Sequence, residues 1–321
     1  MTEKNSAPAA KPDVLVVAKL WPPMMELLQG AFTVHDRTHQ SDPAAFAAAA
    51  PHIRAIAASG ESKVTRELIA QLPALEIVSV YGVGYDGVDV AAARARGVPV
   101  THTPKVLNDD VADLAIGLML AVARRIPQAD RYVRDGRWPG GPAPLGRKVS
   151  GTRLGIVGLG RIGNAIAARA AAFGMSIAYT ARSAKAESPY RFFASAEALA
   201  AQVDFLVVIT PGGAATRKLI DAKVLAALGP DGYLINVARG SVVDETALVQ
   251  ALQQRTIAGA GLDVFEDEPN VPAALCALDN VVLTPHIGSG TWQTRGAMTD
   301  LAFGNLQAHF AGKTLLSPVP E

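Results

Sequence analysis

The chain has 321 residues, of which 50% are apolar and 18% charged, and its formal net charge is +1. This length suggests about two domains of roughly 150 residues, and the composition excludes an intrinsically disordered protein. Charges of both signs are interspersed, without the basic stripe that binds nucleic acids. The longest apolar runs, such as residues 205–209, are far shorter than the ~18 residues that span a bilayer. We therefore expect a folded protein with no nucleic-acid and no membrane partner.

The N-terminus and the single cysteine bear on location. Lys4 and Lys11 enclose only Ala, Pro and small polar residues, without the apolar stretch of a secretory signal peptide, so we expect a frayed arm. Cys276 is the only cysteine and can form no disulfide within the chain and no cysteine-based zinc site. We expect its thiol to be buried and inert, and the protein to be cytoplasmic and to need no metal.

Short apolar runs alternate with alanine-rich helical stretches, as in parallel sheets covered by helices on both faces. The first series predicts strands at residues 13–18, 53–57 and 75–81. A helical pattern then runs from residue 109 to about 135, and a Gly/Pro-rich loop extends from 136 to 146. We predict an α/β fold.

A second series predicts six further strands, the size of a Rossmann sheet. They lie at residues 153–157, 176–180, 204–209, 233–237, 258–263 and 281–284. The last apolar helical pattern, residues 292–310, follows this sheet without a strand of its own. We expect that helix to pack on the first domain.

Residues 154–163, LGIVGLGRIG, place three glycines in GxGxxG spacing between an apolar strand and an alanine-rich helix. Gly158 permits a tight turn, Gly160 lets backbone amides approach a pyrophosphate, and Gly163 allows close helix packing. The phosphates would then lie at the helix N-terminus. An ordinary glycine turn is the alternative, but the flanking strand and helix favour a dinucleotide site.

The residues after the second strand of this series bear on which dinucleotide binds. An NAD site normally has an Asp or Glu there for the ribose hydroxyls, whereas this chain has Thr180, followed by Arg182, Ser183 and Lys185. Arg182 can form paired hydrogen bonds to a 2′-phosphate, Ser183 can add a neutral donor, and Lys185 adds a less directed attraction. We therefore predict that NADP(H) binds. The alternative is NAD(H), which would apply if Arg182 and Lys185 only face solvent and Thr180 contacts the ribose.

Three ionisable residues, Arg239, Glu268 and His286, each follow an apolar run of the second series. Ligands of open α/β sheets bind beyond the carboxyl ends of the strands, so these side chains could converge there. Arg239 can hold a carboxylate through two hydrogen bonds, and His286 can exchange a proton near neutral pH. Glu268 would orient His286 and favour its protonated form. These groups suit reduction of a 2-oxo acid, although each alone could be a surface charge, and Asp263 could be a loop cap.

Four ordered motifs resemble those of the D-isomer-specific 2-hydroxyacid dehydrogenase family, and the resemblance covers nearly the whole chain. They are GLGRIG from Gly158, NVARG from Asn236, DVFEDEP from Asp263 and TPHIGS from Thr284. The resemblance implies that Arg239 binds the substrate, that Glu268 pairs with the histidine, and that His286 is the general acid/base.

The resemblance also implies two Rossmann- or flavodoxin-like domains of doubly wound parallel sheets with a cleft between them. Residues 1–102 and 288–321 would form a discontinuous substrate domain, and residues 103–287 the NAD(P)-binding domain. In VYGVGYDGVD, the backbone amides of Val83 and Gly84 would bind the substrate, although glycines there could equally mark a turn after a strand. The expected cofactor contacts are Gly158, Leu159, Gly160, Arg161, Ile162, Gly163, Thr180, Arg182, Ser183, Thr210, Pro211, Val237, Ala238, Arg239, Asp263, His286 and Gly288.

The GRWPG pattern around Trp138 resembles the glyoxylate and hydroxypyruvate reductase branch of the family. That branch favours NADPH, and the resemblance implies a homodimer in which an aromatic residue here can reach the partner's active site. We predict NADPH-preferring reduction of glyoxylate or hydroxypyruvate to the D-2-hydroxy acid. The alternatives are an NAD(H)-sensing corepressor-like scaffold and a dehydrogenase for another substrate, such as a short phosphoglycerate dehydrogenase.

Overall fold

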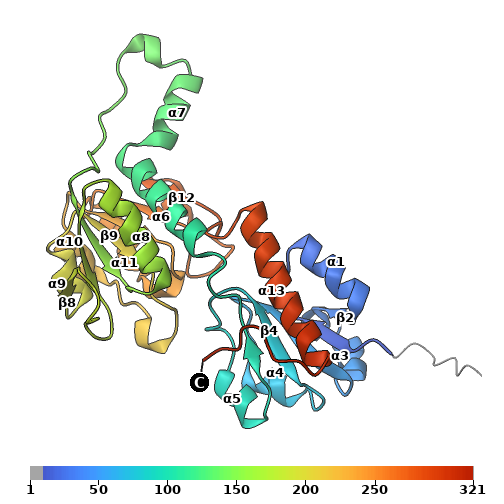
Figure 1. Cartoon of the computed structure of the whole chain (residues 1–321). Coiled ribbons are helices and arrows are strands. Elements are labelled where there is room, and N and C mark those ends of the chain that lie inside the picture. The colour runs from blue at the N-terminus through green and yellow to red at the C-terminus, as the bar shows by residue number, and fades with distance from the viewer. Residues whose placement is uncertain (1–9, 321) are drawn as a thin grey trace, which may run out of the picture. The chain divides into compact units, whose positions relative to one another are not determined.

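A computed structural model describes residues 10–320 (Figure 1). The chain divides into two compact units, one formed by the described residues up to Val106 together with those from Trp292, the other by Leu107–Thr291. Each unit contains a parallel sheet with helices, which confirms the predicted α/β class. Residues 1–9 of the expected N-terminal arm lie outside the described residues. Among the residues described, no helix combines the length and the apolar character of a membrane span.

The described residues of the first unit form a five-stranded sheet with the order β2-β1-β3-β4-β5. Its strands are β1 (Asp13–Val16), β2 (Thr33–Asp36), β3 (Ile53–Ser59), β4 (Ile77–Tyr81) and β5 (Val100–Thr101). The strands β1, β3 and β4 are largely buried, so they are continuous apolar runs and were predicted from the sequence. The half-exposed β2 and the two-residue β5 were missed.

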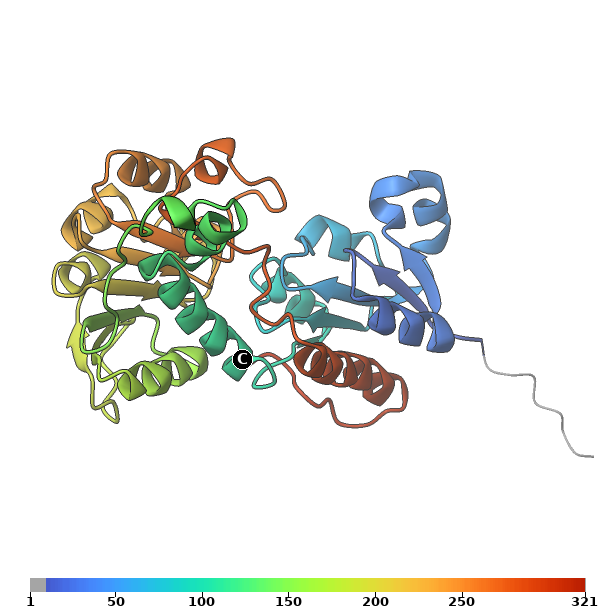
Figure 2. The ribbon, with the colours of Figure 1, turned by 90° about the horizontal axis from the view of Figure 1, so that it is seen from above.

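The helices of the first unit include one from the far end of the chain. They are α1 (Pro22–Ala31), α2 (Thr38–Ser41), α3 (Pro43–Ala49), α4 (Arg66–Ala70), α5 (Val90–Ala95) and α13 (Trp292–Phe310). The last of these packs against β4, where Ser79 Oγ donates to Ala302 O at 3.0 Å, and Figure 2 shows it in dark red beside the blue strands. Its observed bounds agree with the helical pattern at residues 292–310.

The described residues of the second unit form a seven-stranded parallel sheet with the order β12-β11-β10-β9-β6-β7-β8. The strands are β6 (Arg153–Val157), β7 (Ser176–Thr180), β8 (Arg191–Phe193), β9 (Phe205–Val208), β10 (Tyr233–Asn236), β11 (Gly259–Leu262) and β12 (Val281–Leu283). The prediction of six strands omitted β8, a three-residue edge strand. The order reverses between β6 and β9, and ligands of such sheets bind beyond the carboxyl ends of the strands at this point.

The helices of the second unit are α6 (Asn108–Ala123), α7 (Ile126–Arg134), α8 (Arg161–Ala172), α9 (Ala196–Ala200), α10 (Ala222–Leu228), α11 (Glu245–Gln253) and α12 (Ala273–Cys276), with 3-10 turns η1 (Trp138–Gly140), η2 (Ala214–Thr216) and η3 (Gly240–Val242). The single helix predicted from residue 109 to 135 is wrong. It breaks at Arg125, which has a left-handed φ of 55° and pairs with Asp279 at 3.2 Å. The prediction of a buried Cys276 is also wrong, because this residue ends a short surface helix and is exposed.

Candidate active site

The glycine loop joins β6 to α8 and shows why three glycines are needed. Gly158 has a φ of 105°, in the region that favours glycine, and a Cβ there would lie 2.9 Å from the backbone of Thr210. A Cβ on Gly163 would lie 2.3 Å from the carbonyl oxygen of Gly158. Nothing lies within 4 Å of a Cβ built on Gly160, the N-cap of α8. The backbone at this helix N-terminus is therefore approachable, as binding of a pyrophosphate requires.

The end of β7 presents donors and positive charge. Thr180 ends the strand and is buried, with its carbonyl accepting a hydrogen bond from the first glycine of the loop at 2.9 Å. The exposed side chains that follow are those of Arg182, Ser183 and Lys185. This segment is held in place because the Lys185 amide donates to the hydroxyl of the buried Tyr179 at 2.7 Å. The donor set fits the 2′-phosphate of NADP(H), since it contains two cations and a hydroxyl and no carboxylate.

The segment after β9 borders the glycine loop. The backbone of Thr210 is the group that a Cβ on Gly158 would meet. Pro211 follows, and its carbonyl oxygen accepts a hydrogen bond from Thr216 Oγ1 at 2.7 Å. Both predicted cofactor contacts after β9 therefore lie at the same sheet edge as the glycine loop.

The NVARG turn after β10 is organised by the buried Asn236. Its Nδ2 donates to the Arg239 carbonyl at 3.0 Å, and its Oδ1 accepts from the Ala238 amide at 3.1 Å. A Cβ on Gly240 would lie 1.9 Å from the carbonyl carbon of Phe265, so the turn packs directly on the segment that leads to Glu268. The half-buried Arg239 therefore stands on a turn fixed at both ends.

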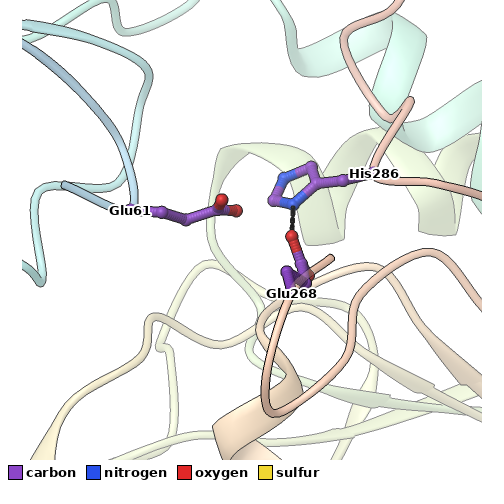
Figure 3. Close-up of side chains that lie close together, drawn as sticks. All are labelled: Glu61, Glu268 and His286. Carbon is purple, nitrogen blue, oxygen red and sulfur yellow. Dashed lines mark hydrogen bonds and ion pairs between the residues drawn. The ribbon is translucent and has the colours of Figure 1, made fainter. Parts of the chain in front are cut away.

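His286 and Glu268 form the predicted pair within the second unit. Figure 3 shows the imidazole above the carboxylate, with 2.8 Å between His286 Nδ1 and Glu268 Oε2. The other carboxylate oxygen accepts from the Phe265 amide at 2.9 Å. Because an ionised carboxylate only accepts hydrogen bonds, Nδ1 carries a proton, and Nε2 is the nitrogen available for proton transfer to a substrate. Glu61, also drawn in Figure 3, belongs to the first unit.

Asp263 holds the backbone that carries the histidine. Its Oδ1 accepts from Thr284 Oγ1 at 2.7 Å and from the Ile287 amide at 2.8 Å, and its Oδ2 accepts from the Gly288 amide at 2.8 Å. Its own carbonyl accepts from the His286 amide at 2.9 Å. Burial raises the pKa of Asp263, and these hydrogen bonds to the carboxylate oppose that rise.

His286 has a left-handed φ of 52°, an uncommon conformation for a residue with a side chain. The contacts of Asp263 stabilise it, so Asp263 is a positioning residue for this loop. This role agrees with the alternative interpretation of Asp263 as a loop cap. Its contact with the cofactor stays a prediction. Arg239, Glu268 and His286 thus follow β10, β11 and β12, which are neighbours in the sheet.

In the first unit, residues 82–87 form a loop after β4, here called the carboxylate loop. The carbonyl of Gly82 accepts from the Thr103 amide at 2.8 Å, and the carbonyl of Val83 accepts from His102 Nδ1 at 2.9 Å. In a trans peptide the carbonyl and the following N–H point in opposite directions. The amides of Val83 and Gly84 therefore point away from these partners. Two amides on neighbouring residues that point away from these partners suit the binding of a carboxylate.

Comparison with known proteins decides the family. The family model described as "D-isomer specific 2-hydroxyacid dehydrogenase, NAD binding domain" matches residues 116–288. The chain belongs to this family. The resemblance stated from the four motifs is confirmed, and the protein is an oxidoreductase.

Three relatives of this 2-hydroxyacid dehydrogenase match most of its length. The 2-ketogluconate reductase of Gluconobacter oxydans (strain 621H) is 46% identical over 311 residues, which are 97% of this chain and 99% of that protein. Glyoxylate/hydroxypyruvate reductase A of Arabidopsis thaliana is 51% identical over 267 residues, covering 83% and 85% of the two chains. The crystal structure of an NADPH-dependent glyoxylate/hydroxypyruvate reductase from Sinorhizobium meliloti, in complex with NADP and malonate, has a TM-score of 0.91 at 49% identity and covers 97% of both chains.

Sequence reasoning missed several residues that position the site of this dehydrogenase. Asn236 and Thr284 were noticed only as the first letters of motifs, and His102 was not considered. The available signal was a polar residue directly after an apolar strand, where a buried polar group needs a local partner. Which backbone group each side chain would meet depends on the neighbouring strand, which the sequence does not specify.

Proposed function

We propose that this dehydrogenase reduces glyoxylate or hydroxypyruvate to the corresponding D-2-hydroxy acid, with NADPH as the preferred reductant. The observation that carries the proposal is the 2.8 Å contact between His286 Nδ1 and Glu268 Oε2, at the sheet edge that also bears Arg239. The relatives named as glyoxylate/hydroxypyruvate reductases support the choice of substrate.

Each residue has a defined part in this reaction. The reduced nicotinamide, when bound, supplies the hydride to C2. His286 holds a proton at Nε2 and donates it to the carbonyl oxygen, and Glu268 stabilises the imidazolium before the transfer. Arg239 binds the substrate and stabilises the negative charge that develops on that oxygen. The amides of Val83 and Gly84 bind the substrate carboxylate.

Two domain roles and a set of cofactor contacts belong to the same proposal. The first unit would correspond to the substrate domain and the second to the NAD(P)-binding domain. The units divide after Val106 and before Trp292, a few residues from the predicted boundaries at 102/103 and 287/288. The glycine loop would bind the pyrophosphate, and Arg182 and Ser183 the 2′-phosphate. The crystal structure of the Sinorhizobium meliloti relative in complex with NADP supports the preference for NADPH.

A homodimer is the proposed assembly, and the cytoplasm the proposed location. In Figure 1, α7 and the loop after it extend away from the remainder of their own unit. Apolar side chains on this arm are exposed, with relative accessibilities of 65% for Trp138 and 95% for Leu145, and Ile126 and Val133 are also exposed. Large apolar groups clustered on one extension are typical of a surface that another protein covers. A second copy of this chain is the partner that the family resemblance implies.

Initial rates of NADPH and NADH oxidation with glyoxylate and hydroxypyruvate test the function. We expect turnover with NADPH well above that with NADH and no turnover in His286→Ala. In Arg182→Ala the ratio of kcat/KM for NADPH to that for NADH should fall at least about tenfold, since a charged hydrogen bond is lost. A native preference for NADH would contradict the role of Arg182. Absence of turnover across a wider panel of 2-oxo acids would favour the corepressor-like scaffold.

A further inference from the structure

A carboxylate side chain stands at the tip of a tight turn beside the carboxylate loop of the first unit. The turn, residues 59–62, follows β3, and Glu61 is exposed on it. The Ser62 amide donates to the Ser59 carbonyl at 3.2 Å, and Ser62 Oγ accepts from the Ser59 amide at 2.8 Å. Ser62 is buried, so its hydroxyl braces the turn from inside while Glu61 lies on the solvent side.

The turn packs against the carboxylate loop at both ends of that loop. A Cβ on Gly82 would lie 3.2 Å from the backbone of Gly60, and a Cβ on Gly87 would lie 2.3 Å from the Ser62 carbonyl oxygen. The carbonyl carbon of Glu61 itself lies 3.5 Å from the second of these positions. Glycines on the carboxylate loop are what allows this approach, since any side chain there would push the segments apart. The backbone of Glu61 is thus fixed next to the loop whose amides we assign to the substrate carboxylate.

We propose that Glu61 determines specificity for the part of the substrate beyond C2, an inference that rests on the proposed function. An ionised carboxylate only accepts hydrogen bonds and repels other anions. Glu61 therefore favours 2-oxo acids that carry a hydroxyl group on C3 and disfavours those with a second carboxylate or a phosphate. Glyoxylate has no C3 and therefore no hydroxyl group that could donate a hydrogen bond to Glu61. The substrate class is that of hydroxylated 2-oxo monocarboxylic acids, which includes hydroxypyruvate and 2-ketogluconate.

This specificity separates the proposed activity from that of a phosphoglycerate dehydrogenase. The phosphate group of a phosphorylated 2-oxo acid carries about two additional negative charges at neutral pH. Close to an anionic side chain such a substrate is disfavoured, because like charges raise the free energy of the complex. Lys63, two residues along the chain, is exposed and has the opposite sign. Removing each charge separately therefore distinguishes contact with the substrate from a general change in local charge.

The test measures kcat/KM of the full-length protein with NADPH for hydroxypyruvate, glyoxylate and oxaloacetate. In Glu61→Gln we expect the hydroxypyruvate to glyoxylate ratio to fall about tenfold, since a hydrogen bond to a charged group is lost. The oxaloacetate to glyoxylate ratio should rise about tenfold, since the repulsion of the second carboxylate is relieved. Glu26→Gln is the matched control, because Glu26 is an exposed glutamate of the same unit on α1.

Three outcomes overturn the inference. The first is a pair of ratios in Glu61→Gln within about twofold of the wild type, a difference too small for a lost charged hydrogen bond. The second is an equal fall of the hydroxypyruvate ratio in Lys63→Gln, which would indicate a general charge effect. The third is a wild-type protein that reduces none of the three acids, and only this result also contradicts the proposed function.

Discussion

Replacing Glu268 with glutamine removes the charge of the acid/base pair and keeps the size of the side chain. In the native chain one carboxylate oxygen lies 2.8 Å from His286 Nδ1 and the other accepts from the Phe265 amide at 2.9 Å. The glutamine oxygen can still accept from Phe265, but its NH₂ group then faces Nδ1 as a donor. The histidine must accept at Nδ1 and carry its proton on Nε2, so its protonated form loses an anionic partner.

The size of the effect follows from the exposure of the pair. A hydrogen bond to a charged group contributes about 1.5–3 kcal/mol. The lower value applies because the side chains of His286 and Glu268 are 34% and 21% exposed, so water screens them. About 1.5 kcal/mol against the protonated imidazole corresponds to about one pH unit. The alkaline limb of kcat/KM for reduction should therefore move to lower pH, and the fall relative to the wild type should grow as the pH rises, up to about tenfold.

The assay is the initial rate of NADPH oxidation with hydroxypyruvate, measured as a function of pH. Glu266→Gln is the matched control, because Glu266 lies on the same loop and pairs with Arg217 at 3.0 Å. The control should keep the pH dependence of the wild type. Identical profiles for the two variants, or a rate in Glu268→Gln reduced by one factor at every pH, would refute the role of this carboxylate.

Four other variants test the cofactor site, stability and assembly. Gly160→Ala should keep the melting temperature, because nothing lies within 4 Å of the new Cβ. The same Cβ would keep the pyrophosphate away from the backbone amides, so NADPH binding measured by calorimetry should weaken by at least about tenfold. Gly163→Ala should lower the melting temperature as well, since its Cβ would lie 2.3 Å from a backbone oxygen of the glycine loop. Arg153 lowers the pKa of Asp204, so this carboxylate stabilises the fold above its ordinary pKa and loses that contribution as the pH falls through the lowered value. Asp204→Asn should therefore cost about 1–2 kcal/mol in urea unfolding near neutral pH, and the difference from wild type should shrink as the pH falls through the lowered pKa of Asp204. Leu145→Glu, at a side chain that is 95% exposed, should convert a dimer into monomers in light scattering with the monomer still folded, and an unchanged mass would contradict the assigned interface.

The sequence by itself determined the fold class, the buried strands, the last helix and the identity of the pair. Buried parallel strands are continuous apolar runs, so β6 and β7 have the predicted bounds, as does the last helix at residues 292–310. The motifs named Glu268 and His286 because residue type and order along the chain are sequence properties. Short edge strands such as β2 and β8 carry too few residues for a pattern, and they form because a neighbouring strand pairs with them.

Only the tertiary structure decided how the site is held. The break at Arg125 has a local cause that the prediction overlooked, because Pro127 lies two residues further on and cannot continue a helix, so α7 begins anew around it. The pairing of Arg125 with Asp279, far along the chain, is visible only in the tertiary structure. Asp263 was ambiguous between cofactor contact and loop cap, and the structure shows its carboxylate receiving three hydrogen bonds from the loop that carries His286. A buried carboxylate must find such donors, but which segment supplies them depends on the lateral order of β10, β11 and β12. That order is a property of the assembled sheet.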